Sequence, residues 1–386
     1  NLNYTEERSV TIWISDTEYP QFSNYWDNNA TLQGSGKGLF NVTITSTNGT
    51  VWLEVDNTNI TATNLTSDVY NASYDFTGSG TYVYRWHSWG NGTNHNYNKS
   101  VDREYFVNET NSIAFIYPVQ YVMVQRHNST TGEIRIFGNY TGNPVTIEAN
   151  FSDSGWQVID SNPSGGLFNG TLNASFGQGI LSVRFSNNNS ITDKVNDVGI
   201  GDLYVIGGQS NAEGGGINNN TLNSSNMYNA TVYREDDYWK IADDPTDSTS
   251  GEGSAWVGLA DWIIQNQSVP VGFITAAIGG TVISTWQKGQ TSYDAMYNQI
   301  SEATNGTMRV KTMLFFQGET DVVQSTGYND YKNDLSKMAD DFIKDTEIAT
   351  TVIVGQINDR VSDTRTTIDN IRRAQRDSWN ENNNIS

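Results

Sequence analysis

The stretch Gly199-Ile200-Gly201-Asp202-Leu203-Tyr204-Val205-Ile206-Gly207-Gly208-Gln209-Ser210-Asn211-Ala212 decides how the second half of this 386-residue chain folds. An apolar, strand-like run ends in two glycines, so the sequence predicts a sharp turn that carries Gln209, Ser210 and Asn211. A serine on such a turn is exposed, and the backbone N–H groups around it can point at the same spot. A serine nucleophile requires this arrangement.

From about residue 199 onward, short apolar runs alternate with amphipathic segments. The predicted strands cover residues 202–206, 271–276, 312–316 and 351–355, and the predicted helices cover residues 255–265, 293–303, 328–344 and 365–379. This alternation is typical of a parallel sheet with helices on its faces, in which ligands bind at the carboxyl ends of the strands. We therefore predict an α/β domain over residues 199–386.

Upstream of the turn the chain is predicted to be all-β. Residues 1–112 show short alternating strands separated by polar turns, including a hairpin expected at Asn48-Gly49, and they indicate a β-sandwich. Tyr82, Tyr84 and Trp86 share one face of a strand, and core packing is a better explanation for them than a sugar-binding platform. Residues 113–198 hold four further strand candidates and form a second β-rich domain.

The composition of the chain limits the classes of binding partner and the cellular locations that are expected for it. The formal net charge of −21 and the pI near 4.3 argue against nucleic acid and anionic membranes as partners, and no apolar run is long enough to span a bilayer. Cysteine is absent, and the absence of an initiator Met suggests a processed or truncated piece of a longer product. The composition is compatible with a homo-oligomer or with a surface assembly of this chain.

Asn-x-Ser/Thr sequons are abundant, at about two dozen, which exceeds the chance expectation. With no cysteine and a strongly acidic composition, they favour an extracellular or cell-surface glycoprotein of an archaeon or an archaeal virus. Candidate glycosylation sites among these sequons are Asn41, Asn48, Asn64, Asn91, Asn128, Asn169, Asn219 and Asn305.

Three of the predicted strand ends carry glycine with polar residues. They read Gly207-Gly208-Gln209-Ser210-Asn211, Ala277-Ile278-Gly279-Gly280-Thr281 with Trp286 following, and Phe316-Gln317-Gly318-Glu319. A single glycine turn is weak evidence, but three at successive strand ends converge on one cleft. This set resembles the sialate O-acetylesterase branch of the SGNH (GDSL-like) hydrolases, which holds carbohydrate acetyl esterases. The resemblance covers about residues 113–386 and implies a flavodoxin-like parallel sheet, while residues 80–107 resemble immunoglobulin-like repeats of microbial surface proteins.

The resemblance implies serine esterase chemistry on an acetylated carbohydrate, without a cofactor and without a metal. Ser210 matches the nucleophile. The oxyanion would be held by the backbone N–H groups of Ser210 and Gly280 and by the side-chain amide of Gln317. Glu319 would orient Gln317 or Asn211, or serve only as a structural carboxylate.

Substrate contacts are expected from Gln209 and Asn211, and from Trp286, which stacks on a sugar or packs beneath the loop. The acidic, glycine-rich segment from about 214 to 253 is expected to be a solvated rim or lid of the cleft rather than a calcium site.

The chain departs from this family in one respect that matters for catalysis. A serine hydroxyl needs a base, and the family supplies it in an Asp-x-x-His after the last helix, which these residues do not contain. The three histidines, His87, His95 and His127, all precede the predicted α/β domain. Two interpretations follow. Either a further C-terminal segment carries Asp and His, or the domain is a non-catalytic scaffold or sugar-binding module of a surface-layer, filament or virion glycoprotein.

Overall fold

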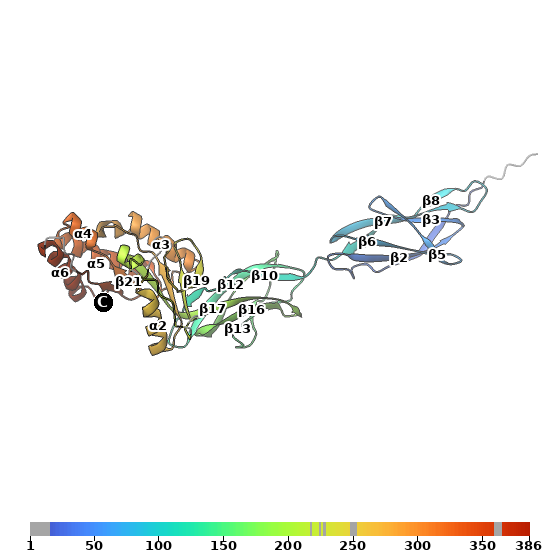
Figure 1. The fold of residues 1–386 in the computed structure, drawn as a ribbon. Helices are drawn as coiled ribbons and strands as arrows, with labels where there is room; N and C mark the ends of the chain where they lie inside the picture. The colour runs from blue at the N-terminus through green and yellow to red at the C-terminus, as the bar shows by residue number, and fades with distance from the viewer. Residues whose placement is uncertain (1–15, 217, 224, 227–228, 248–252, 359–364) are drawn as a thin grey trace, which may run out of the picture. The chain divides into compact units, whose positions relative to one another are not determined.

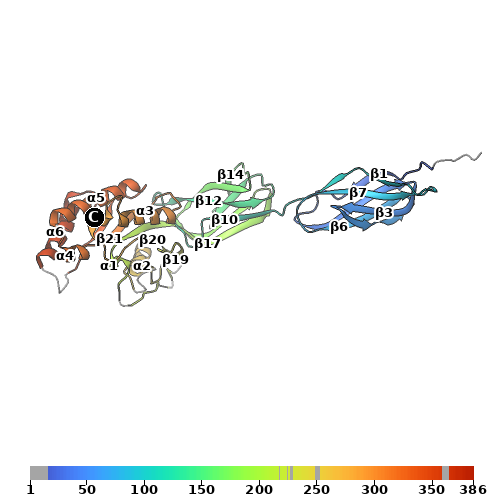
Figure 2. The same cartoon turned by 90° about the horizontal axis from the view of Figure 1, so that it is seen from above.

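A computed structural model describes residues 16–216, 218–223, 225–226, 229–247, 253–358 and 365–386. These residues divide into two compact units (Figures 1 and 2). The first comprises residues up to Ser112 together with Thr141–Asn143, and the second comprises Ile113–Tyr140 and Pro144–Ser386. Each unit has hydrophobic clusters of its own and is described separately below.

The first unit is a β-sandwich of two antiparallel sheets. One sheet has the order β1-β2-β6-β5, and the other has the order β4-β3-β7-β8 with β9 beside β7. The bounds are β1 Gln21–Asp27, β2 Gly36–Thr45, β3 Thr47–Val55, β4 Thr58–Thr61, β5 Thr63–Thr66, β6 Val69–Phe76, β7 Gly80–Gly90, β8 Tyr97–Lys99 and β9 Arg103–Val107.

Aromatic side chains fill the core between the two sheets. Tyr84 and Trp86 are fully buried and Tyr82 packs at the edge of the core, which confirms the interpretation of this stripe as packing. The hairpin expected at Asn48-Gly49 is wrong, because β2 and β3 belong to opposite sheets. The chain changes sheets at Ser46, whose backbone is left-handed with φ +57°, instead of folding back on itself.

The second unit begins with two packed sheets. A three-stranded sheet, β10-β12-β15, covers one end of a ten-stranded sheet whose main path is β14-β13-β16-β17-β20-β18-β19. The bounds are β10 Ser112–Tyr117, β11 Met123–Gln125, β12 Thr131–Thr141, β13 Ile147–Phe151, β14 Gln157–Asp160, β15 Leu167–Ser175, β16 Gly177–Phe185 and β17 Asn188–Gly208. The predicted boundary between residues 198 and 199 falls inside β17, which runs on without a break.

The other half of the large sheet is parallel. Strand β17 pairs in parallel with β20 on one side and β21 on the other, β18 pairs in parallel with β20, and β22 pairs in parallel with β21. The bounds are α1 Ser210–Glu213, β18 Ala230–Tyr233, β19 Trp239–Ile241, α2 Trp256–Gln267, β20 Val271–Thr275, η1 Ile283–Trp286, α3 Thr291–Ala303, β21 Thr312–Phe316, α4 Glu319–Gln324, α5 Tyr328–Asp345, β22 Val352–Gly355 and α6 Arg365–Glu381.

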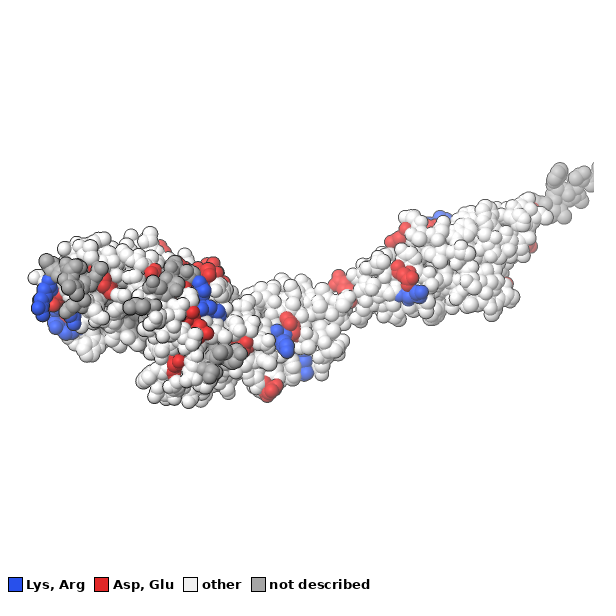
Figure 3. Space-filling model, in the orientation of Figure 1, with Lys and Arg blue, Asp and Glu red and all other residues white. Residues whose placement is uncertain are grey.

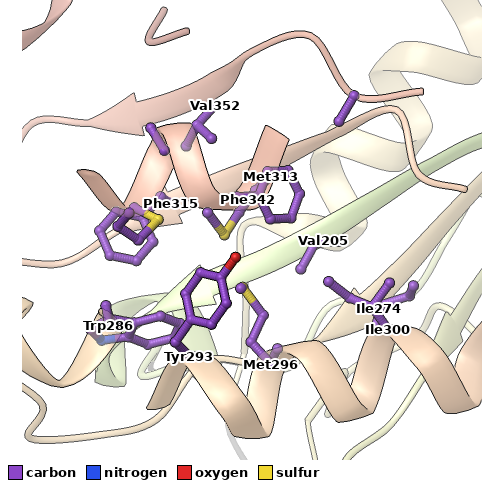
Figure 4. Close-up of a cluster of buried hydrophobic side chains, with 14 of the residues drawn as sticks. Val205, Ile274, Trp286, Tyr293, Met296, Ile300, Met313, Phe315, Phe342 and Val352 are labelled. Atoms are coloured by element: carbon purple, nitrogen blue, oxygen red, sulfur yellow. The ribbon is translucent and has the colours of Figure 1, made fainter. Parts of the chain in front are cut away.

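Helices cover both faces of this parallel half. Alternate residues of β17 point to opposite faces, so Leu203 and Val205 pack in the cluster with α3, α5 and α6, whereas Tyr204 and Ile206 pack in the cluster with α2. Figure 4 shows part of the larger cluster, in which Val205 lies among side chains from the neighbouring strands and helices. The carboxyl end of β17 is thus held rigidly at the middle of the sheet.

The segment expected to be a solvated rim supplies part of the sheet instead. Its residues Ala230–Tyr233 form β18, and all four are buried. The carboxylates of Asp243 and Asp244 accept hydrogen bonds from backbone N–H groups of Leu222, Asn220 and Ser254. The acidic residues of this segment therefore order its loops.

In the face shown in Figure 3, acidic and basic side chains are scattered among uncharged residues. Within the described part of the chain, no helix is both long enough and apolar enough to cross a membrane.

Candidate active site

The turn after β17 presents Ser210 at the surface. Gly208 has φ +125°, and a Cβ atom there would lie 2.0 Å from the carbonyl oxygen of Phe316 on β21. Only glycine allows this approach, which lets the chain leave the sheet and begin α1 within two residues. Ser210 is the first residue of α1 and is exposed, and its hydroxyl has no hydrogen-bond partner within the described residues. Because a first-turn N–H has no partner inside the helix, the Ser210 N–H is available to a ligand.

The loop after β20 is fastened to this turn by two hydrogen bonds. The Ile278 N–H donates to the Gly208 carbonyl at 2.8 Å, and the Gly279 N–H donates to Glu213 Oε1 on α1 at 2.6 Å. The next residue, Gly280, is exposed with φ +72°, and its N–H has no partner in the described structure. Glu213 loses water on folding, and this desolvation raises the pKa of its carboxyl, although the Gly279 N–H acts in the opposite direction. The Gly279 N–H is therefore bonded within the protein, whereas the Gly280 N–H is available to a ligand.

Gln317, the residue that follows β21, bonds its side-chain amide to groups of the protein itself. Its side chain is fully buried, and its Nε2 donates to Asp321 Oδ2 at 2.5 Å and to the carbonyl of Thr281 at 2.9 Å. Its Oε1 accepts from the Tyr331 hydroxyl at 3.1 Å. Since both N–H groups already have acceptors, the side chain offers no free donor for an oxyanion in this arrangement. Instead, Gln317 holds the loop that carries Gly280.

Glu319 contacts Asn211, one of the two residues that it was predicted to orient. The Asn211 side-chain amide donates to Glu319 Oε1. Glu319 is the first residue of α4 and is mostly buried, and its Oε2 has no hydrogen-bond partner within the described residues. Asn211 is exposed and directly follows Ser210 in sequence, so this bond fixes a side chain next to the candidate nucleophile.

Two of the residues expected to contact substrate have buried side chains, and for Trp286 this is the packing alternative. Trp286 has no exposed surface and packs against Phe315 (Figure 4), with ring centroids 5.2 Å apart. Its indole N–H donates to Thr281 Oγ1 at 3.1 Å. Gln209 is also buried, and its Oε1 lies 3.3 Å from the Thr320 N–H at the start of α4. Both side chains support the site from beneath.

Sequence reasoning missed Asp321, which joins two of the loops. This carboxylate is fully buried and accepts from Gln317 Nε2, from the Ile283 N–H at 2.9 Å and from the Thr326 hydroxyl at 2.7 Å. Burial raises its pKa, and these hydrogen bonds offset only part of the increase. The signal was its position four residues after Gln317, in the first turn of a helix that follows a strand, where a carboxylate can reach back to the residue after that strand.

Within the described residues of the second unit, no histidine lies at Ser210. His87 and His95 lie in the first unit, and His127 is exposed with its Nε2 2.7 Å from Arg309 Nη1. The last three residues, Asn384–Ser386, run along the edge of the sheet in parallel with β22, and the Ser386 N–H donates to the Val352 carbonyl at 2.8 Å.

The sequon asparagines are accessible. Asn48, Asn64, Asn91, Asn128, Asn169 and Asn219 are exposed, and Asn41 and Asn305 are half-buried. Glycosylation at these positions stays a prediction.

Comparison with known proteins places the similarity in the α/β region. One relative is described as a probable carbohydrate esterase of Arabidopsis thaliana, and it is 25% identical over 157 residues, which cover 35% of this chain. The chain spans 60% of the length of that relative. Among solved structures, a carbohydrate acetylesterase from Xanthomonas citri matches with a TM-score of 0.48 at 18% identity, covering 70% of this chain and 68% of its own. A protein of Arabidopsis thaliana matches with a TM-score of 0.38 at 20% identity, covering 45% of this chain and 80% of its own. Residues 200–385, just under half of the chain, match the family described as SASA, carbohydrate esterase, sialic acid-specific acetylesterase.

Proposed function

We propose that this protein is a carbohydrate O-acetyl esterase of the sialate O-acetylesterase-like SGNH type, with Ser210 as its nucleophile. One observation carries the proposal. An exposed serine with an unpartnered hydroxyl begins a helix at the carboxyl end of the central strand, and the loop with the free Gly280 N–H is bonded to the same turn. The match of residues 200–385 to a carbohydrate esterase family supports it.

The reaction follows from these groups. Ser210 Oγ attacks the carbonyl carbon of the acetyl group while its proton passes to a base. The N–H groups of Ser210 and Gly280 stabilise the negative charge on the carbonyl oxygen. The sugar hydroxyl then leaves with a proton, and water releases acetate from the acyl-enzyme. In this proposal Gln317, Asp321 and Glu319 act by positioning, since each is bonded to a loop of the site.

A second candidate function is favoured by one observation. Residues 128–386 contain no histidine, and His127 of the second unit contacts Arg309, so this part of the chain offers no histidine to deprotonate the serine. The domain would then bind acetylated sugar without cleaving it, as part of an extracellular glycoprotein. The exposed sequons support that location.

Acetate release from an O-acetylated sugar and from 4-nitrophenyl acetate distinguishes the two functions. For an esterase, Ser210→Ala is expected to reduce turnover by roughly 10³-fold or more, because the covalent step is lost. The matched control is Ser284→Ala, which removes an exposed hydroxyl from the neighbouring turn η1 and is expected to leave turnover unchanged. Equal hydrolysis by wild type and Ser210→Ala would exclude Ser210 as nucleophile.

Added imidazole tests whether Ser210 lacks only a base to accept its proton. If Ser210 lacks only a proton acceptor, imidazole is expected to accelerate hydrolysis by the wild type well beyond its effect on Ser210→Ala. The binding alternative predicts no hydrolysis with or without imidazole, together with calorimetric binding of the acetylated sugar that Ser210→Ala retains.

A further inference from the structure

The outer face of one sheet in the first unit contains a hollow with apolar walls. The hollow has a volume of about 410 Å³ and lies over β1, β2, β5 and β6, the sheet opposite β3 and β7 in Figure 1, with Ile60 and Thr61 of β4 at its edge. Three large side chains around it are exposed to water, with exposed fractions of 52% for Trp26, 43% for Leu39 and 52% for Leu65. Apolar side chains gathered in a concavity on a soluble domain usually indicate that something covers them.

A sequon asparagine lies inside this hollow. The strand register aligns Trp26 on β1 with Asn41 on β2, Asn41 with Asn71 on β6, and Asn71 with Thr63 on β5. These four residues therefore form one row across the same face of the sheet, and all four line the hollow. The Asn41 side-chain amide is half-buried and has no hydrogen-bond partner within the described residues.

The chemistry of the walls suits a neutral, partly polar ligand. Within the described residues the hollow is lined by apolar, hydroxyl and amide side chains and by no charged one; the polar members include Thr61, Thr63, Asn71 and Ser73. A pyranose has C–H faces that pack on an indole ring and hydroxyl groups that bond to such polar groups. The volume falls within the ~300–1,000 Å³ usual for small-molecule sites.

A second copy of the chain is a poorer occupant. Stable protein interfaces need about 800 Å² from each partner, whereas this hollow is rimmed by three exposed apolar side chains. Two copies would also bring together chains with a formal net charge of −21 each.

We propose that Asn41 carries an N-linked sugar whose first rings occupy this hollow and pack against Trp26. The bond forms when Asn41 Nδ2 displaces the phosphate leaving group at the anomeric carbon of an activated glycosyl donor and loses one proton. The glycan covers the exposed apolar side chains of the sheet. Asn71, in the sequon Asn71-Ala72-Ser73, is the neighbouring acceptor in the same row. The inference rests on the proposed extracellular glycoprotein location, but not on catalysis.

Glycopeptide mass spectrometry of the chain from its native source tests the attachment. Occupied Asn41 is expected together with occupied sequons in the second sheet and its loops, such as Asn48 and Asn91. If those two are occupied and Asn41 is bare, the inference about the hollow is overturned while the glycoprotein proposal stands. If no sequon is occupied, the glycoprotein location fails and the inference fails with it.

Hydroxyl-radical footprinting of Trp26 tests where the sugar lies. Thr43→Val destroys the sequon and keeps Asn41, and Asn41→Gln provides a second variant, each checked for folding by circular dichroism. Trp26 is expected to be oxidised several-fold faster in both variants than in the wild type. Trp89, which is 40% exposed on the other sheet, serves as the internal control and keeps its rate. Equal oxidation of Trp26 in all three proteins, or protection that depends on protein concentration because a second copy covers it, would overturn the proposal.

Discussion

Gly208 sets how closely β17 and β21 approach at the candidate site. Its φ of +125° and the 2.0 Å separation between a would-be Cβ and the Phe316 carbonyl oxygen leave no room for a side chain. We expect Gly208→Ala to lower the free energy of unfolding of the second unit by at least ~3 kcal/mol, because the strands must separate or the backbone must take a strained conformation. Urea denaturation measures this. Gly258→Ala, at an exposed position in the first turn of α2 with open space around it, is the control and should stabilise by at most ~0.5–1 kcal/mol.

Asp321 gives the second unit a pH dependence whose sign follows from its burial. Its pKa is raised above the ordinary 3.8, so the folded state binds this proton more tightly than the unfolded chain. The protonated Asp321 carboxyl therefore adds to the free energy of unfolding. This contribution is fully present below pH 3.8 and is lost as the pH rises through the pKa of the folded state. We therefore expect Asp321→Asn to gain stability relative to the wild type as the pH rises from below 3.8 toward neutrality.

Paired urea titrations of the two proteins across this pH range measure that difference, and the effects of the other carboxyl groups cancel between them. A difference that moved in favour of the wild type with rising pH would mean that the folded protein favours the ionised form.

At the scale of elements, most strands and helices of the α/β region were predictable from the sequence. Which of the side chains at the strand ends would be buried was not. Runs such as residues 312–316 are apolar because both faces of a parallel strand are covered, and this leaves a clear pattern in the sequence. Strand β18 was missed because its four buried residues lie within a polar, acidic segment. Trp286 follows a glycine loop, and nothing in the local sequence distinguishes a ring above that loop from one beneath it. The partners of Gln317 depend on Asp321 and Thr281, which tertiary packing brings to it.

Strand β17 connects two kinds of sheet, and a buried ion cluster marks the junction. It pairs with β16 in antiparallel fashion and then with β20 and β21 in parallel. Where the pairing of β17 changes from antiparallel to parallel, the buried carboxylate of Asp202 forms ion pairs with Arg126 Nε at 2.7 Å and with Lys311 Nζ at 2.5 Å. These contacts join the loop after β11 and the start of β21 to the same strand. The packing of both halves of the second unit therefore depends on one carboxylate.

Removing that carboxylate should be costly, because it leaves two partly buried cations unpaired. We expect Asp202→Ala to lower the free energy of unfolding by about 3–5 kcal/mol. Lys337→Ala breaks the exposed pair with Asp341 on α5 and should cost only ~0.3–0.5 kcal/mol. Chemical denaturation followed by tryptophan fluorescence compares the two variants. Similar small losses in both would show that the cluster does not hold the junction.

At the scale of the whole molecule, the two units have separate cores. The cluster that contains Trp86 draws only on the first unit, and the three other clusters draw only on the second. Cooperative unfolding requires a shared core, so calorimetry of the full chain should resolve two transitions. Trp86→Ala is expected to remove about 3–5 kcal/mol from the first unit and shift only its transition, whereas Gly208→Ala should shift only the other. Deleting residues 1–112 should leave the second midpoint within a few degrees. A single transition that both substitutions lower would mean that the units fold as one, and the site at Ser210 would then depend on the sandwich for its stability.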